Sequence, residues 1–520
     1  MNRQNIIKQL ARVLDFNPAW ACGSAGKAAQ TQMLVKILTA KFPPGASDLQ
    51  DSLMMCALGL IRWAWQQHPL DPDVLQLVSI LAGAGAELGQ MSRIAAETEV
   101  SLASLSERAS ANSFATPDEL AEFMHSLPDF SSKPILQKRL EAEQALFHSP
   151  KEAEGLVEGL DSSLFGLWQA QARLELVSKL GISHFNPENF QGVWPEFYWH
   201  TNFTLALFDL LHPAKSANSF KSQVPPPILL YSWNKRDALF QTLESLRASN
   251  IGNAPVFVLD NGSTDDSLEI LLAQKEQWGT PFTVISLAAN VGAPVARNWL
   301  LSLPEVQSAP WVVYLDDDVI LQENWLEGLC GTALDNPGYG AVGCRVTDHI
   351  PPYGIQAADF HLLSPEEATH SFEDMDEHVF PFCSGMGETQ EAMYAYTRPC
   401  VSVTGCCHLI NMQAIKTAGA FDVRFNPSQF DDLERDLRSS LSGFPTYYHG
   451  QLTVRHMQHS SLRQAMGVPQ QAHIMGNKIK LEFLLDAKQA AKLRQENFER
   501  VKADLLRKCA RLESTFGKKA

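Results

Sequence analysis

Short β-prone segments alternate with helical segments in the middle of this 520-residue chain, and this alternation constrains the fold more than any other feature. The pattern predicts strands at 228–233, 256–259, 282–285 and 311–316, with a helix after each of the first three. Strands that alternate with helices form βαβ units, in which neighbouring strands run parallel. The sequence therefore predicts an α/β domain with a mostly parallel sheet.

The last predicted strand ends at three consecutive acids, Asp316, Asp317 and Asp318. Open α/β sheets bind ligands at the carboxyl ends of their strands, so these acids are expected at a binding site. Side chains alternate along a strand, and Asp316 and Asp318 are therefore expected to share one face. Adjacent carboxylates repel one another and lose solvation when buried, which favours a compensating Mn²⁺ or Mg²⁺ ion with a diphosphate. The alternative is an acidic turn that caps the next helix.

Three further polar segments follow the first three predicted strands in chain order. Residues 231–236 follow the first strand, residues 260–265 the second, and residues 290–298 the third. The acids and hydroxyls of the second segment suit ribose hydroxyls, a uracil ring and the cap of the next helix. Taken alone, however, Asp-Asn-Gly-Ser is also a common turn. Arg297 in the third segment suits a phosphate, although it also fits the surface of a helix.

Together and in this order, the four segments resemble the family 2 glycosyltransferases of GT-A fold. The resemblance implies a domain that binds a nucleotide sugar and a divalent metal ion. Carried over residue by residue, it implies that Asp260 holds the base, Asp316 the ribose or the metal, and Asp318 the metal that bridges the diphosphate. The nucleotide-sugar residues that it implies are Ser232, Asn234, Arg236, Asp260, Asn261, Ser263, Asn290, Arg297, Asp316 and Asp317.

Segments downstream resemble the acceptor half of the same family, at 403–410, 419–422 and 430–434. The last one contains an acidic pair where the family has its catalytic base. The resemblance assigns the base to Asp432 and leaves Asp431 as the alternative, while an acidic helix cap would explain either residue without catalysis. In a Val-x-His segment, His456 would complete the metal shell with Asp316 and Asp318, or would be a structural histidine.

The resemblance thus implies an inverting, metal-dependent glycosyltransferase of the hexosyl or deoxyhexosyl type. Its donor would be a UDP- or dTDP-linked sugar, its cofactor Mn²⁺ or Mg²⁺, and its acceptor a glycan, a lipid-linked molecule or a protein. Two other functions stay open, namely a catalytically inactive binding or scaffold protein and a nucleotidyltransferase. The second is disfavoured because the segment after the first strand contains no glycine.

Helical patterns dominate both sides of the α/β domain. We predict a helical domain over 1–217, a linker over 218–227, the glycosyltransferase-like domain over 228–460 and a C-terminal helical extension over 461–520. The first domain is expected to be either a degenerate tetratricopeptide-like repeat or an irregular bundle, and either one suits a protein partner. A basic amphipathic helix near the end predicts either peripheral membrane contact or packing against the rest of the protein. Its apolar stripe consists of Phe498, Val501, Leu505 and Leu512.

Composition narrows the cellular setting. The formal net charge of −16 argues against binding to nucleic acid, whose phosphates attract basic surfaces. No signal peptide or membrane-spanning segment is apparent, which predicts a cytoplasmic protein whose membrane association, if any, runs through the C-terminal helix. Nine cysteines without a CxxC pair are expected to be reduced and mostly buried. The cluster Cys406-Cys407-His408 is accordingly expected to be core rather than a metal site.

Overall fold

The structure of this protein is a computed structural model that describes residues 6–43, 45–83, 88–102, 116–213, 224–279, 281–368, 377–457 and 468–517. The chain divides into two compact units. The helical unit comprises Met1–Leu211, Gln390–Met393 and Leu505–Ala520, and the α/β unit comprises His212–Thr389 and Tyr394–Asp504. The predicted linker over 218–227 lies mostly outside the described residues.

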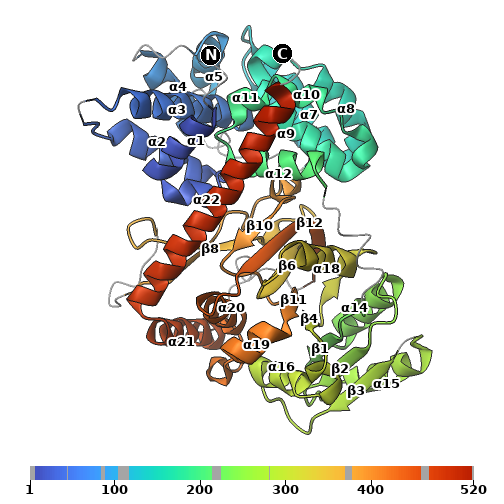
Figure 1. Cartoon of the computed structure of the whole chain (residues 1–520). Coiled ribbons are helices and arrows are strands. Elements are labelled where there is room, and N and C mark those ends of the chain that lie inside the picture. The colour runs from blue at the N-terminus through green and yellow to red at the C-terminus, as the bar shows by residue number, and fades with distance from the viewer. Residues whose placement is uncertain are drawn as a thin grey trace. The chain divides into compact units, whose positions relative to one another are not determined.

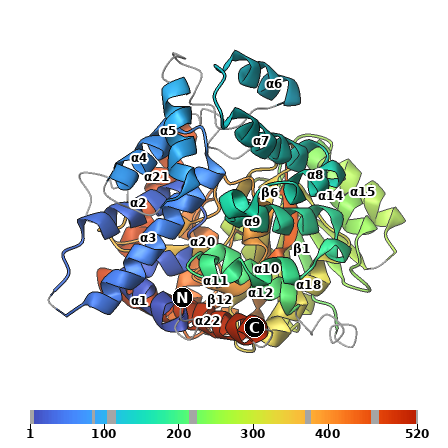
Figure 2. The same ribbon diagram turned by 90° about the horizontal axis from the view of Figure 1, so that it is seen from above.

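Amphipathic helices build the helical unit, and Figure 2 shows the first four of them side by side. The first helix follows the expected stripe, because Ile6, Leu10, Val13 and Leu14 are all buried. The aromatic rings of Trp63, Phe197 and Phe203 pack together at centroid distances of 4.7 and 4.3 Å. The α-helices of this unit before its last segment are α1 (Ile6–Phe16), α2 (Lys27–Thr39), α3 (Ser47–Gln67), α4 (Pro72–Gly83), α5 (Gln90–Leu102), α6 (Pro117–Ser126), α7 (Lys133–His148), α8 (Pro150–Glu158), α9 (Ser162–Leu180), α10 (Glu188–Gln191), α11 (Trp194–Phe197) and α12 (Thr201–Leu211).

Helix α3 is the centre of this unit, since it packs against α1, α2, α4 and α9. Short 3₁₀ turns, η2 (Pro18–Cys22) and η3 (Ile182–His184), connect some of the helices. None of the described helices is both long and apolar enough to cross a membrane.

Within the described residues, ten strands form the main sheet of the α/β unit (Figure 1). Their order is β10-β12-β6-β11-β4-β1-β2-β3, with β5 paired to β12 and β7 paired to β6. The strands are β1 (Ile228–Ser232), β2 (Val256–Asp260), β3 (Phe282–Ser286), β4 (Trp311–Leu315), β5 (Val319–Ile320), β6 (Ala341–Asp348), β7 (Ile355–Ala357), β10 (Thr397–Cys400), β11 (Cys407–Asn411) and β12 (Thr446–His456).

The α/β fold class predicted from the sequence is confirmed. Strands β4, β1, β2 and β3 are parallel to one another, as their alternation with helices requires. Beyond β4 the sheet is mixed, because β11 runs antiparallel to both β4 and β6. The register places Ser232, Asp260 and Ser286 side by side at the carboxyl ends of their strands. That edge is where the polar segments after the strands gather.

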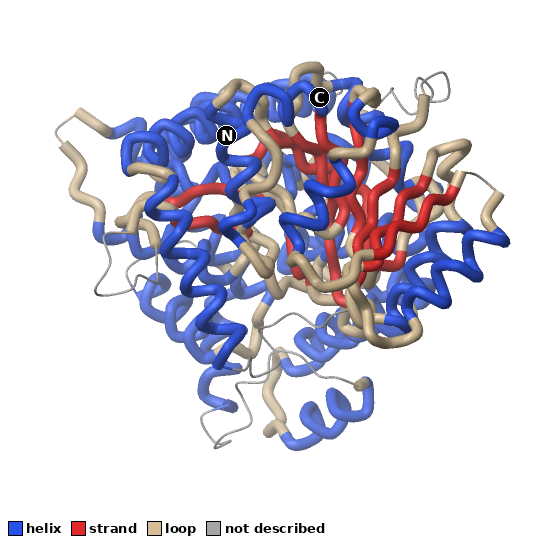
Figure 3. The backbone as a smooth tube through the Cα atoms, turned by 90° about the horizontal axis from the view of Figure 1, so that it is seen from below, coloured by secondary structure: helices blue, strands red, loops and turns tan. Residues whose placement is uncertain are grey.

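Helices cover both faces of the sheet, whose strands are red in Figure 3. On one face, side chains of α14 (Arg236–Ala248), α15 (Ser267–Gln277) and α18 (Trp325–Asp335) join the strands in one buried apolar cluster. On the other face, α16 (Ala293–Leu301) and α19 (Met412–Ala418) contribute to a second cluster. Helix α16 begins after Gly292, whose φ of 84° brings the chain into the helix, and it carries a proline in its first turn. The short helix α17 (Pro304–Gln307) leads into β4.

The C-terminal helices form a third apolar cluster in the α/β unit. Leu433 of α20 (Asp431–Leu441), Leu481 of α21 (Val468–Leu484) and Leu493 of α22 (Ala487–Gly517) are all buried in it. The small hairpin of β8 (Phe360–Leu363) and β9 (Phe380–Cys383) lies against the same cluster through Leu362 and Val379. Two further 3₁₀ turns are η4 (Glu391–Tyr394), which precedes β10, and η5 (Val423–Phe425), which lies between α19 and α20.

One face of the last helix and the cysteines are buried in the structure. The apolar stripe of α22 is packed within the protein, since Val501, Leu505 and Leu512 are 1%, 0% and 0% exposed. It is therefore not available to a membrane surface, and packing against protein is the correct alternative. All nine cysteines are free and buried, as the absence of CxxC pairs predicted.

Candidate active site

The acidic triplet lies in the turn that joins β4 to β5. Strand β4 ends at Leu315, one residue earlier than predicted, so strict alternation of side chains no longer holds for the acids. The pairing of Asp316 with Asp318 on one face implied that Asp317 points away from both, but Asp317 and Asp318 contact the same ammonium group. Lys235 Nζ donates to Asp318 Oδ2 at 2.8 Å and to Asp317 Oδ1 at 3.1 Å.

Lys235 supplies part of the positive charge that three adjacent acids require. Burial alone would lower its pKa, but Asp317 and Asp318 outweigh burial and raise the pKa of Lys235. Burial has the opposite effect on the acid: it raises the pKa of Asp317, and the charge of Lys235 opposes that shift. Lys235, which follows Asn234 after β1, thus compensates part of the negative charge, and the expected divalent ion stays a prediction.

His456 contacts the same triplet from β12. Its Nε2 lies 2.9 Å from Asp318 Oδ1, and its Nδ1 lies 2.7 Å from Gln356 Oε1. The amide of Gln356 in turn donates to Asp348 Oδ1 at 2.6 Å. Burial tends to raise the pKa of Asp318, but the contacts with His456 and Lys235 lower it to about 2. For His456 the balance is reversed, because burial lowers its pKa and Asp318 raises it above the usual value.

The donor groups of Asp316, Cys406 and His456 converge on one point. One ligand atom from each of them lies within 4.8 Å of the other two. Burial and the nearby Asp318 raise the pKa of Asp316 to about 6, against the opposing charge of Arg297. The buried Oδ1 of Asp316 has no hydrogen-bond partner. A carboxylate, a thiol and an imidazole at this spacing fit a divalent metal ion.

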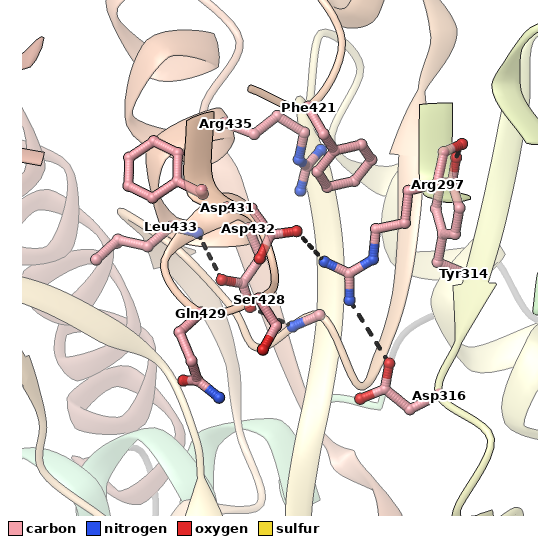
Figure 4. Close-up of polar contacts among 12 residues, drawn as sticks. Arg297, Tyr314, Asp316, Phe421, Ser428, Gln429, Asp431, Asp432, Leu433 and Arg435 are labelled. Carbon is pink, nitrogen blue, oxygen red and sulfur yellow. Dashed lines mark hydrogen bonds and ion pairs between the residues drawn. The ribbon is translucent and has the colours of Figure 1, made fainter. Parts of the chain in front are cut away.

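Arg297 connects the acidic triplet to the acidic pair of α20, as Figure 4 shows. Its Nη1 donates to Asp431 Oδ2 at 2.5 Å, and its Nη2 lies 3.5 Å from Asp316 Oδ1. The guanidinium also lies over the rings of Tyr231 and Phe421, at 5.4 and 5.2 Å from the ring centroids. The contact of Arg297 with a phosphate stays a prediction; within the chain its guanidinium contacts two carboxylates. The cause is burial, because a buried guanidinium needs counter-charges nearby.

The two acids at the start of α20 have different surroundings. Asp431 is buried against Arg297, and burial raises its pKa. Asp432 is partly exposed and accepts two backbone hydrogen bonds, from Gly405 at 2.7 Å and from Leu433 at 2.8 Å. Gly405 leaves no room for a side chain, because an added Cβ would lie 2.8 Å from Arg297 Nη2 and 3.1 Å from Asp432 Oδ2. Asp432 is therefore the acid of the pair that a ligand can reach.

The segment before α20 adopts a strained backbone. Gln429 and Phe430 have φ values of 81° and 69°, in the left-handed region that non-glycine residues rarely adopt. The buried side chain of Asn477, on α21, donates to the carbonyls of Phe425, Ser428 and Gln429 at 3.1, 2.8 and 3.0 Å. A residue of the C-terminal helices therefore fixes the segment that leads into the acidic pair.

The remaining predicted donor-site residues join the strand ends to one another. Asp260 accepts from Ser263 N–H at 3.1 Å and from Ser286 Oγ at 2.9 Å. Asn261 donates to Asn290 Oδ1 at 3.0 Å, which joins the second and third segments.

The first segment is tied to the second in the same way. Asn234 accepts from Thr264 N–H at 2.7 Å, and its own N–H donates to Ser263 Oγ at 3.1 Å. Ser232 is buried beside Asp260. The exposed side chain of Arg236 contacts Asp237 at 2.8 Å, while its backbone N–H donates to Asp265 Oδ2 of the second segment at 3.2 Å.

Comparison with known proteins identifies the α/β unit. Residues 228–417 match the family model described as glycosyl transferase family 2. The chain contains a family 2 glycosyltransferase domain. The match runs from β1 into α19 and includes the acidic triplet, Arg297 and Cys406, whereas the acidic pair and His456 lie beyond it. No curated protein matches the chain.

Three solved structures are similar to the chain at low identity. GalNAc-T7 with UDP, GalNAc and Mn²⁺ is 13% identical over 50% of this chain and 48% of its own, with a TM-score of 0.39. TarS of S. aureus is 12% identical over 50% of this chain and 44% of its own, with a TM-score of 0.32. The mannosyltransferase PcManGT from Pyrobaculum calidifontis, in complex with GDP-Man and Mn²⁺, is 12% identical over 61% of this chain and 84% of its own, with a TM-score of 0.33. The similarity thus spans less than half of the first two proteins.

Sequence analysis of the glycosyltransferase domain missed four residues of the site: Lys235, Gln356, Cys406 and Asn477. Lys235 carried a usable signal, since it stands inside the polar segment after β1. Cys406 was assigned to the core because the chain has no second cluster at metal-ligand spacing. It is indeed buried in the apolar core, but its thiol also lies close to Asp316 and His456. Gln356 and Asn477 lie in segments without any motif, and only their tertiary contacts reveal them.

Proposed function

We propose that this protein is an inverting, metal-dependent glycosyltransferase that moves a sugar from a nucleoside-diphosphate sugar to an acceptor hydroxyl. One observation carries the proposal: Arg297 contacts Asp431 at 2.5 Å and Asp316 at 3.5 Å, and Asp432 follows Asp431. Arg297 thereby holds the acidic pair, which includes the proposed base Asp432, close to Asp316, which is proposed to bind the metal ion at the donor diphosphate. An acidic cap or an acidic turn alone would need no such connection.

The donor would lie along the carboxyl ends of β1, β2 and β4. Asp260, Asn261, Ser263 and Asn290 are expected to face the base and the ribose, with a UDP- or dTDP-linked sugar as the donor. The hydrogen bonds among these side chains hold the loops in position before the donor arrives, which reduces the entropy lost on binding. Because Arg236 points to the surface, its proposed contact with the donor requires a change of rotamer.

A divalent ion, Mn²⁺ or Mg²⁺, would be held by Asp316, Asp318 and His456. When bound, it supplies positive charge that stabilises the diphosphate as the leaving group. Asp318 already binds Lys235 and His456, so this carboxylate must exchange partners for the ion. Lys235 is then free to approach a phosphate oxygen of the donor.

Asp432 is proposed as the general base. It takes the proton of an acceptor hydroxyl while that oxygen forms a bond with the anomeric carbon. The bond from the anomeric carbon to the diphosphate breaks, its electron pair leaves with the nucleoside diphosphate, and a single displacement inverts the centre. Gly405 N–H and Leu433 N–H orient the carboxylate. The buried Asp431 holds Arg297 and stays out of the proton transfer.

The test measures nucleoside-diphosphate release from UDP-, dTDP- and GDP-linked sugars, with and without Mn²⁺. Wild-type protein should hydrolyse at least one donor slowly with water as the acceptor, and Asp432→Asn should not. Glu276→Gln, which changes an exposed acid on α15, is the matched control and should retain activity. Donor binding without release by the wild type would support an inactive binding protein. Release of pyrophosphate from a nucleoside triphosphate would support a nucleotidyltransferase.

A glycan, a lipid-linked molecule or a protein is proposed as the acceptor, and the helical unit as the part that binds a protein partner. The described part of that unit before its last segment consists of twelve α-helices, with α3 packed against α1, α2, α4 and α9. Pull-down of a partner by the full-length chain, and its loss on Val35→Glu or Ile80→Glu, which change exposed apolar residues of the helical unit, would test this second assignment.

A further inference from the structure

The metal donors proposed above are oxygens and an imidazole nitrogen, but the structure adds a sulfur atom to the same point. The Cys406 thiol lies within 4.8 Å of donor atoms of both Asp316 and His456. Among the described residues, this is the one group of three or more His, Cys, Asp or Glu side chains that meets this spacing. The other cysteines are thus distinguished from Cys406 by their surroundings.

Local backbone structure holds Cys406 at this point. Asp316 N–H donates to the carbonyl of Cys406 at 2.9 Å, which fixes the end of β4 against the residue before β11. The preceding Gly405 is fixed in turn by its hydrogen bond to Asp432. The thiol therefore belongs to the same rigid framework as the two acids that the proposed reaction uses, and it does not depend on a mobile loop.

The neighbouring acids are already engaged, which leaves Asp316 as the available carboxylate. Lys235 contacts both Asp317 and Asp318, and His456 contacts the second oxygen of Asp318. By contrast, Asp316 Oδ1 has no hydrogen-bond partner, and its ion pair with Arg297 is long at 3.5 Å. A cation would therefore displace only the long Arg297 contact at Asp316, whereas His456 would exchange one of its contacts, to Asp318 or to Gln356, for the ion.

We propose that Asp316, Cys406 and His456 form a divalent metal site whose thiolate ligand selects thiophilic ions such as Zn²⁺ and Co²⁺ over Mg²⁺. Thiolate and imidazole ligands favour these ions, whereas Mg²⁺ prefers oxygen alone. On binding, the Sγ–H bond of Cys406 breaks, its proton passes to solvent, and the sulfur electron pair forms the bond to the ion. The place of this site in catalysis rests on the proposed function, but its existence does not.

Cobalt absorption tests the proposal without any measurement of activity. Full-length protein, freed of tags and of metal by a chelator, is titrated with Co²⁺ and its near-ultraviolet spectrum is recorded. A thiolate ligand gives a charge-transfer band that should reach its maximum at one equivalent and disappear when Zn²⁺ is added. Cys406→Ala should remove the band and weaken Co²⁺ binding at least about tenfold, because one of three donors is lost. Cys407→Ala, the adjacent buried cysteine, should keep it.

Cadmium NMR of the wild-type protein gives a second measurement that needs no variant, because a thiolate ligand shifts the cadmium resonance strongly downfield. This measurement decides the question if Cys406→Ala does not fold, as judged by circular dichroism. A cobalt complex without a charge-transfer band, a band that persists in folded Cys406→Ala, or a cadmium resonance typical of oxygen ligands would each overturn the proposal. Donor hydrolysis without the band would refute only the thiolate ligand, whereas the band without hydrolysis would refute only the proposed function.

Discussion

Replacement of Asn477 by alanine should impair catalysis from outside the acidic pair. The side chain of Asn477 is buried on α21 and donates to three carbonyls of the segment 425–429, which leads into Asp431 and Asp432. Its removal leaves these carbonyls without their shared donor and leaves no polar group in its place. The acids themselves are unchanged, so any loss of rate must come from their position.

The magnitude follows from the strain that Asn477 restrains. A non-glycine residue in the left-handed region costs on the order of 1–3 kcal/mol, and Gln429 and Phe430 are two such residues in succession. The net gain from a buried hydrogen bond is about 1 kcal/mol, and an unsatisfied carbonyl costs about 1–3 kcal/mol. One lost hydrogen bond and one unsatisfied carbonyl together give roughly 2–4 kcal/mol, and we expect Asn477→Ala to lower the free energy of unfolding by this amount. The segment can then relax and displace Asp432.

The assay compares kcat and KM for the donor with stability in urea. A displacement of 1 Å at a reacting group can cost about 100-fold in rate, so kcat should fall roughly 10- to 100-fold while the donor KM stays the same. His473→Ala, an exposed position on the same helix, is the matched control. Gln429→Gly, which removes one source of strain, should restore part of the stability in the Asn477→Ala background. An unchanged kcat at the expected loss of stability would refute the positioning role.

Three further outcomes follow from the site. Asp432→Asn should lower kcat by roughly 10²- to 10⁴-fold and the free energy of unfolding by about 1 kcal/mol, since it removes the base and one of its two backbone hydrogen bonds; full transfer activity would exclude Asp432 as the base. Gly405→Ala should abolish activity in a folded protein, because its Cβ would displace both Arg297 and Asp432; a rate within twofold of wild type would contradict the crowding. Burial lowers the pKa of His449 to about 4 in the folded protein, whereas its pKa in the unfolded chain is about 6.5. Between these pH values the unfolded chain binds a proton at His449 and the folded protein does not, which favours unfolding. Unfolding free energy should therefore drop by up to roughly 3 kcal/mol between pH 6.5 and 4, and by less in His449→Gln, as urea titrations at both pH values would measure.

The sequence was sufficient for the parts of the site that follow from local pattern. Strands β1 to β4 were predicted because apolar runs, turn residues and helix periodicity are encoded within a few residues of one another. Parallel strands place their carboxyl ends at one edge, so the polar segments after them could be brought together without knowledge of long-range contacts. The same reasoning gave the α/β fold class of the unit, and the expectation that the cysteines are mostly buried is confirmed.

Long-range partners were beyond that reasoning. Lys235 is separated by 82 residues from Asp317, and Arg297 by 134 residues from Asp431. A lysine after a strand is usually an exposed residue, and an arginine on a helix has many possible partners, so neither contact has a local signature. The apolar stripe of α22 was equally ambiguous, because periodicity shows that a face is apolar but not whether protein or lipid covers it.

The separate roles of the three adjacent acids could not be predicted from the sequence, because the partners of each carboxylate depend on residues far away in the chain. In the structure Asp316 pairs with Arg297, Asp317 with Lys235, and Asp318 with both Lys235 and His456. The chain thus brings cationic or protonatable groups to its own acidic triplet. A divalent ion would displace some of these contacts, and the long 3.5 Å contact between Arg297 and Asp316 is the weakest to lose. Because Arg297 would keep its shorter bond to Asp431, entry of the ion at Asp316 leaves the acidic pair in position for the acceptor.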